Sequence, residues 1–175
     1  ALLVGSMLIT FLRHCDRIKI ACLAQLVNVI APIFTQTGGG IFAQTIFYPF
    51  EHLSNFGRGV ALNPIISSPK YDCKAYTDVP FLESIATFDE ENEEMTVFCV
   101  NKSMNEGMTL DVNLLDFDGY KPFEFISMDG YDKNDVNSFE NPFVKPHNNP
   151  LPEFDNKTLT AQIKPFSWNV IRLKK

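Results

Sequence analysis

The predicted fold depends on one stretch of sequence, Ile18-Lys19-Ile20-Ala21-Cys22-Leu23-Ala24-Gln25-Leu26-Val27-Asn28-Val29-Ile30. It begins with a short, almost continuous apolar run, residues 18–23, and then places Gln25 and Asn28 among Leu, Val and Ile. Such a run is typical of a strand buried on both faces, as in parallel sheets covered by helices. An unpaired buried amide costs about 1–3 kcal/mol, so both amides need hydrogen-bond partners. In barrels of parallel strands the active site lies at the strand ends, where a partner could be a ligand.

Two helices are predicted to flank this strand. Residues 2–14 place apolar side chains at helical spacing, and Arg13 in the last turn suits the helix dipole. Residues 46–56 carry a second apolar stripe, and Gly57 is a plausible stop. The order helix, strand, helix is one step of an alternating α/β fold. Residues 31–44, which contain three consecutive glycines, are predicted to be a loop.

After Gly59 the pattern changes to short strands separated by turn residues. The predicted strands are residues 81–88, 95–101, 108–114, 123–128, 159–163 and 167–173. An acidic turn, residues 89–94, joins the first two into a hairpin, and residues 129–155, rich in Asn, Asp and Pro, are predicted to be a long loop. Several short strands with no helix between them indicate an antiparallel sandwich.

Length and charge exclude several classes of protein. The chain has 175 residues, whereas a complete (β/α)₈ barrel typically takes about 250. The net charge is −6 and the basic residues are scattered, which argues against a nucleic-acid partner. The apolar run of residues 2–12 is shorter than the roughly 20 residues that span a bilayer, so no membrane partner is expected. Because this run starts abruptly and without Met, we expect the chain to be the tail of a longer protein.

Residue types that carry chemistry are few. The four cysteines show no metal-like spacing with the three histidines, so we expect no metal and no cofactor. Cys22 and Cys99 lie in apolar runs and are predicted to be buried thiols. Glu51 is expected to have a surface or packing role, and no two carboxylates are placed across a cleft as glycoside hydrolysis requires. We therefore assign no catalytic residue within the chain.

Six separated runs are similar to the C-terminal part of α-L-arabinofuranosidases of glycoside hydrolase family 51, and they occur in family order. The runs are residues 20–30, 44–50, 57–62, 78–80, 96–101 and 167–173. The resemblance implies an α+β chain. Residues 1–58 would be the helix–strand–helix remnant of a (β/α)₈ catalytic barrel, and residues 59–175 a jelly-roll-like antiparallel β-sandwich. Residues 129–155 are the least distinctive stretch.

Members of this family remove terminal arabinofuranosyl groups with retention of configuration, using two glutamates about 5 Å apart as acid/base and nucleophile. In the family both glutamates precede the segment that residues 20–30 resemble. The resemblance therefore implies that they lie upstream of Ala1 and that the chain alone is inactive. It also implies an arabinose-containing oligo- or polysaccharide as the partner, and we expect a cytoplasmic location.

Gln25 matches the family glutamine that hydrogen-bonds arabinose in the −1 subsite. An amide offers a donor and an acceptor, which suits a sugar hydroxyl. The alternative is that Gln25 only satisfies neighbouring backbone groups. Asn28 is predicted to be structural and to hold the loop that follows.

A competing hypothesis makes the sandwich a non-catalytic module for carbohydrate binding or for assembly. Carbohydrate-binding modules often display an aromatic platform, but the single Trp, Trp168, is predicted to lie in the core. An isolated helix–strand–helix unit would also expose apolar surface. We therefore predict that residues 1–56 drive association into a homo-oligomer or pack back onto the sandwich.

Overall fold

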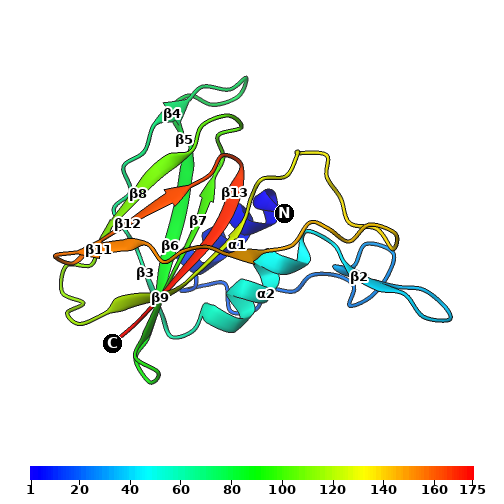
Figure 1. Cartoon of the computed structure of the whole chain (residues 1–175), viewed down its shortest axis with the longest axis horizontal. Coiled ribbons are helices and arrows are strands. Elements are labelled where there is room, and N and C mark those ends of the chain that lie inside the picture. Colours follow the sequence, from blue (N-terminus) through cyan, green and yellow to red (C-terminus); the bar gives the residue numbers. More distant parts are fainter.

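The computed structural model describes all 175 residues and consists mainly of two antiparallel β-sheets stacked face to face (Figure 1). Six strands form the larger sheet, in the spatial order β10 (His147–Asn148), β9 (Lys121–Met128), β13 (Ser167–Lys174), β7 (Glu94–Asn101), β6 (Leu82–Asp89) and β3 (Val60–Leu62). Three strands form the smaller sheet, in the order β11 (Glu153–Asp155), β12 (Thr158–Ile163) and β8 (Met108–Asn113). The predicted antiparallel sandwich is therefore confirmed.

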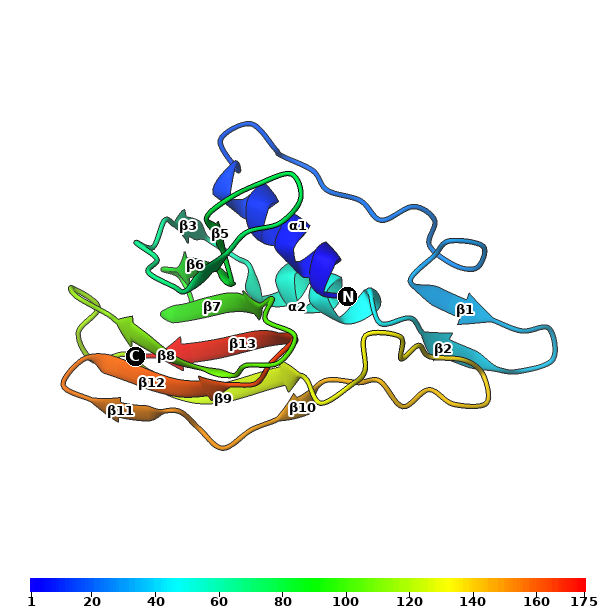
Figure 2. The same cartoon turned by 90° about the horizontal axis from the view of Figure 1, so that it is seen from above.

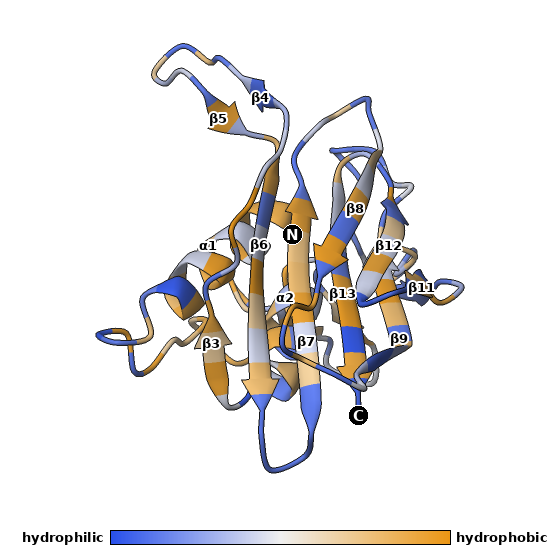
Figure 3. Cartoon of the chain, turned by 90° about the vertical axis from the view of Figure 1, so that its left-hand side faces the viewer, coloured by the Kyte–Doolittle hydropathy of each residue, from blue (hydrophilic) through white to orange (hydrophobic).

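The core between the two sheets follows the alternation of apolar residues in the sequence. On β12, Leu159, Ala161 and Ile163 are buried, whereas Gln162 is exposed. The larger sheet contributes Cys99 and other residues to the same core. Figure 3 shows this distribution, with hydrophobic residues along β6, β7 and β13 and a hydrophilic turn between β6 and β7. That turn consists of residues 90–93, because Asp89 and Glu94 of the predicted turn 89–94 pair as the last residue of β6 and the first of β7.

Two helices, α1 (Leu2–Arg13) and α2 (Phe47–Phe56), cover the outer face of the larger sheet, opposite the smaller one (Figure 2). Both predicted helices are confirmed. Pro49 lies in the first turn of α2, where its missing N–H costs no helical bond. A second core lies beneath the helices and includes Ile9, Phe98, Val100, Trp168 and Val170. Neither helix is long and apolar enough to cross a membrane.

Contact between α1 and the sheet is close because Gly5 has no side chain. A Cβ atom at this position would lie 2.7 Å from Cε3 of Trp168 and 3.4 Å from Cγ2 of Val100. Trp168 is fully buried, which confirms its predicted place in the core. It therefore cannot form the exposed aromatic platform of a carbohydrate-binding module.

The strand predicted at residues 18–23 is wrong. These residues form no regular structure, and Ile20 is 83% exposed. Cys22 is also exposed, which contradicts its predicted burial, whereas Cys99 is buried as expected. A parallel strand is stable only between neighbouring strands that pair with its edges. No other strand pairs with residues 18–23 in this chain, so the apolar run stays extended and accessible.

Short strands also form in segments where no strand was predicted. Residues 31–44 contain a hairpin of β1 (Ile33–Thr35) and β2 (Ile41–Ala43). A second hairpin, β4 (Lys70–Tyr71) with β5 (Val79–Pro80), projects from the sandwich at the top of Figure 3. Residues 129–155 are irregular apart from β10 and β11.

Candidate functional site

The predicted sugar ligand, Gln25, lies in the irregular segment that joins α1 to β1. Its side chain is exposed and forms no hydrogen bond with the rest of the chain, and the peptide bond between Ala24 and Gln25 is cis. The alternative role, in which the amide only satisfies neighbouring backbone, is therefore not seen in this structure. The carbonyl and amino groups of Gln25 are both accessible to a ligand.

Asn28 connects the Gln25 segment to the β1–β2 hairpin. Its Nδ2 donates to Oγ1 of Thr35 (3.0 Å), and its Oδ1 accepts from the backbone N–H of Thr35 (2.8 Å). Its own backbone N–H donates to the carbonyl of Ile33 (2.8 Å). The backbone φ of +62° lies in the left-handed region, which Asn tolerates better than most residues. The structure confirms that Asn28 holds the loop that follows it.

Gln44 closes the base of the same hairpin. Its Nε2 donates to the carbonyl of Ala31 (2.9 Å), and its backbone N–H donates to the carbonyl of Pro32 (2.8 Å). Between these ends, the rings of Phe34 and Phe42 stack at 5.2 Å with an interplanar angle of 15°. Hydrogen bonds of Asn28 and Gln44 thus hold both strands of the hairpin, although each strand has only three residues.

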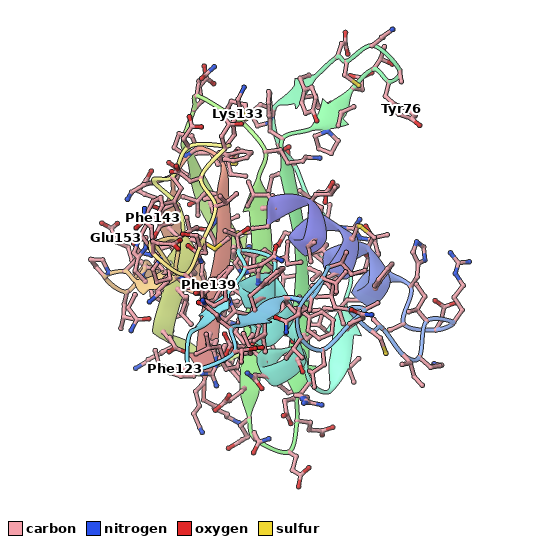
Figure 4. All side chains as sticks on the ribbon, turned by 90° about the vertical axis from the view of Figure 1, so that its right-hand side faces the viewer. Tyr76, Phe123, Lys133, Phe139, Phe143 and Glu153 are labelled. Atoms are coloured by element: carbon pink, nitrogen blue, oxygen red, sulfur yellow. The ribbon has the colours of Figure 1, made fainter.

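A loop of the sandwich, residues 129–146, reaches this hairpin. Asn137 donates from Nδ2 to the carbonyl of Ala43 (2.9 Å), and the Phe139 ring meets the Phe42 ring edge-on at 4.8 Å. Figure 4 shows Phe139 where the loop and the hairpin meet. This contact could not be predicted from the sequence, because the loop has no periodic pattern. Its only signal was a length unusual for a connection without regular structure.

No histidine forms a hydrogen bond with Gln25 or with another histidine. Trp168 donates from Nε1 to Nδ1 of His52 (3.0 Å), and burial lowers the pKa of His52 to about 4, so it is neutral at pH 7. His14 contacts Arg17, and His147 lies 3.6 Å from the buried carboxylate of Asp129. No group of three His, Cys, Asp or Glu side chains lies close enough together to hold a metal ion.

Glu51, the carboxylate of α2, is partly buried beside Tyr48. Burial raises the pKa of Glu51. Burial also raises the pKa of Tyr48, with smaller contributions from Glu51 and Tyr131. This pair lies on the helix that covers the sheet, and neither residue was predicted to be functional.

Residues 1–167 match the model of the α-L-arabinofuranosidase C-terminal domain. The chain belongs to this family. It is 50% identical over its whole length to intracellular exo-α-(1→5)-L-arabinofuranosidase 1 of Bacillus subtilis, and 53% identical to the intracellular exo-α-(1→5)-L-arabinofuranosidase of Halalkalibacterium halodurans. It spans 35% of the length of each of these relatives.

A solved structure of the same enzyme family has the same fold as this chain. A family 51 α-L-arabinofuranosidase of Bifidobacterium longum superimposes on the whole chain with a TM-score of 0.89 and 35% sequence identity. The chain covers 34% of that protein. The two helices and the sandwich of this chain are thus similar to one part of the solved relative.

Proposed function

We propose that the chain supplies the C-terminal part of a retaining, exo-acting α-L-arabinofuranosidase. This glycoside hydrolase would remove terminal α-L-arabinofuranosyl residues from arabinose-containing oligo- or polysaccharides. The observation that carries the proposal is the end-to-end match, at 50% and 53% identity, to relatives named for that activity. Those relatives are also named intracellular, which supports a cytoplasmic location.

Catalysis would need residues outside the chain. Retaining hydrolysis requires two carboxyl groups about 5 Å apart, on either side of the scissile bond. Residues 1–58 would belong to a catalytic barrel, and residues 59–175 would form the accessory sandwich. Support comes from the exposed apolar run of residues 18–30, which neighbouring barrel strands would cover, and from the fraction of the relatives' length that the chain matches. We therefore expect the 175-residue chain to be inactive by itself.

Gln25 would bind the terminal arabinosyl group. Its exposed amide can donate to one hydroxyl and accept from another, and Asn28 fixes the backbone three residues further on. A hydrogen bond between the amide and a sugar hydroxyl would orient the ring for attack at the anomeric carbon.

A hybrid enzyme tests the proposal. The chain would replace the matching C-terminal part of the Bacillus subtilis relative, and the hybrid would be assayed on 4-nitrophenyl α-L-arabinofuranoside. We expect turnover by the hybrid and none by the 175-residue chain. Gln25→Ala should lower kcat/KM by about ten- to a hundredfold, the effect of one lost hydrogen bond to substrate.

Gln36→Ala is the matched control, because Gln36 is another exposed glutamine on the adjoining hairpin. It should leave kcat/KM unchanged. A folded but inactive hybrid would contradict the proposed function, and equal effects of the two glutamine variants would contradict the role of Gln25. Turnover by the chain alone would contradict the view that its carboxylates are insufficient.

A further inference from the structure

Asn137 joins the sandwich loop to the β1–β2 hairpin through a buried amide. Its Nδ2 donates to the carbonyls of Ala43 (2.9 Å) and Val144 (2.8 Å), and its Oδ1 accepts from the N–H of Val144 (2.8 Å). The residue is 8% exposed. An amide satisfied at both ends on two segments holds them at a fixed separation, because breaking either contact would leave a buried polar group unpaired.

Aromatic packing reinforces this contact. The Phe139 ring stands edge-on to Phe42, with ring centres 4.8 Å apart. It also lies directly over Gly40, where an added Cβ atom would come within 2.8 Å of Cδ1 of Phe139. The loop and the hairpin are therefore in van der Waals contact at the hairpin tip and hydrogen-bonded at its base.

The loop is braced internally although it has little regular structure. The Tyr131 hydroxyl donates to the carbonyl of Lys145 (2.9 Å) and accepts from the N–H of Lys145 (3.1 Å). The N–H of Asn141 donates to Oγ of Ser138 (3.1 Å). The loop also starts and ends in the larger sheet, after β9 and at β10. The loop therefore holds the hairpin at a fixed position relative to the larger sheet.

Three amide side chains continue this connection towards Gln25. Asn137 donates a hydrogen bond to Ala43. Gln44, which follows Ala43 in the sequence, donates one to Ala31, and Asn28 donates one to Thr35. Each amide bridges two segments, and the last one lies three residues from Gln25. We infer that Asn137 is a positioning residue for the sugar site, which fixes the hairpin and thereby the segment that carries Gln25. The functional half of this inference rests on the proposed function.

Amide hydrogen exchange in the 175-residue chain tests the structural half. The informative protons are those of Asn28, Thr35 and Gln44, which bond across the hairpin region. Asn137→Ala should accelerate their exchange about tenfold, the effect of one lost hydrogen bond on local opening, while protons in β7 and β13 keep their rates. Asn141→Ala, an exposed residue of the same loop, should match the parent chain. Unchanged rates in Asn137→Ala would overturn the inference.

Further variants distinguish the loss of the contact between Asn137 and the hairpin, called the tether below, from a loss of folding of the loop itself. Asn137→Asp keeps the acceptor for the Val144 N–H but loses the donor to Ala43, so the hairpin protons should exchange as in Asn137→Ala while the Val144 proton stays protected. Phe139→Leu should accelerate hairpin exchange as well, whereas Phe143→Leu, whose ring contacts only Tyr131 among the aromatic side chains, should not. Hairpin rates unaffected by both Asn137→Asp and Phe139→Leu would overturn the inference even if Asn137→Ala fails to fold.

The hybrid enzyme tests the functional half. At a temperature well below its melting point, Asn137→Ala should lower kcat/KM on the aryl arabinofuranoside about tenfold, and Asn141→Ala should not change it. An active hybrid whose kcat/KM is insensitive to Asn137→Ala would overturn the positioning role while the Gln25 variant still supports the proposed function. An inactive parent hybrid would overturn the proposed function alone, and the exchange rates would then decide whether the tether exists.

Discussion

His52 and Trp168 form a hydrogen bond at the centre of the interface between α2 and the larger sheet. His52 is 6% exposed and accepts the indole N–H at 3.0 Å, so its Nδ1 must be unprotonated. Protonation would place a charge in a desolvated site and remove the acceptor. Burial accordingly lowers the pKa of His52 from 6.5 to about 4, although Glu124 acts weakly in the opposite direction.

This pKa predicts a loss of stability in mild acid. Between pH 6.5 and about 4 the unfolded chain binds a proton at His52 and the native chain does not, so the free energy of unfolding falls as the pH falls. The full loss, reached below pH 4, is on the order of 3 kcal/mol. Urea unfolding at pH 7.5, 6, 5 and 4.5 measures it.

Two variants isolate the contribution of His52. His52→Gln can still accept from Trp168 but does not titrate, so its stability should change less with pH than that of the parent chain. His14→Gln removes a histidine near the surface that contacts Arg17, and should keep the parent's pH dependence. Equal slopes for the parent chain and His52→Gln would refute the assignment.

At the scale of elements, α1 docks on the sheet through a position that tolerates no side chain. In an exposed helix Gly→Ala stabilises by about 1 kcal/mol, because Ala has the higher helix propensity. At Gly5 the added methyl would overlap the Trp168 ring at 2.7 Å. We expect Gly5→Ala to destabilise the chain by about 1–3 kcal/mol, the usual cost of overpacking a core.

Urea unfolding at pH 7.5 measures this effect. Ser6→Ala is the control, since it also introduces alanine, at the next helix position, which is only partly buried and already carries a Cβ atom. Its free energy of unfolding should stay within about 0.5 kcal/mol of the parent value. A Gly5→Ala chain more stable than the parent would show that α1 can move away from Trp168 without cost.

Elements with a strong local pattern could be predicted from the sequence. The β6–β7 hairpin, predicted at 81–88 and 95–101, occupies 82–89 and 94–101. Both helices begin and end within one residue of their predicted limits. In these segments the alternation or the helical stripe identifies the buried face, and neighbouring residues supply the turn. In these segments the sequence pattern therefore predicts the observed element.

Elements whose formation depends on distant partners could not be predicted in the same way. The run at residues 18–23 has the composition of a buried strand but no strand beside it. The β1–β2 hairpin was missed because its support comes from Asn137, which is separated from Ala43 by 94 residues. Within the candidate site, residue type identified Gln25 and Asn28, but nothing local in the sequence marks Asn137 as their distant support.

At the scale of the whole molecule, the exposed apolar side chains between α1 and α2 predict self-association. Ile20, Leu26 and Val29 are each more than three-quarters exposed, and Ile41 of the hairpin is 70% exposed. Exposed apolar surface of this kind promotes association in water. We predict that the chain sediments as a homo-oligomer at micromolar concentration.

Sedimentation velocity tests this prediction. The triple variant Ile20→Ser, Leu26→Ser and Val29→Ser should shift the distribution towards the monomer. Ile65→Ser, at a fully exposed position on the connector between β3 and β4, should leave it unchanged. A parent chain that is monomeric at all concentrations would contradict the prediction.

The order of strands in the larger sheet constrains how the protein can fold during synthesis. β13 follows β7 and β9 in the sequence and is therefore synthesised after both, yet it lies between them and pairs with both along its length. Until residues 167–174 leave the ribosome, β9 and β7 have no common neighbour, and each exposes an unpaired edge. Such edges favour aggregation of partly folded chains. We therefore expect folding to complete only after β13 has been synthesised, and chaperones that shield nascent chains to matter for its yield.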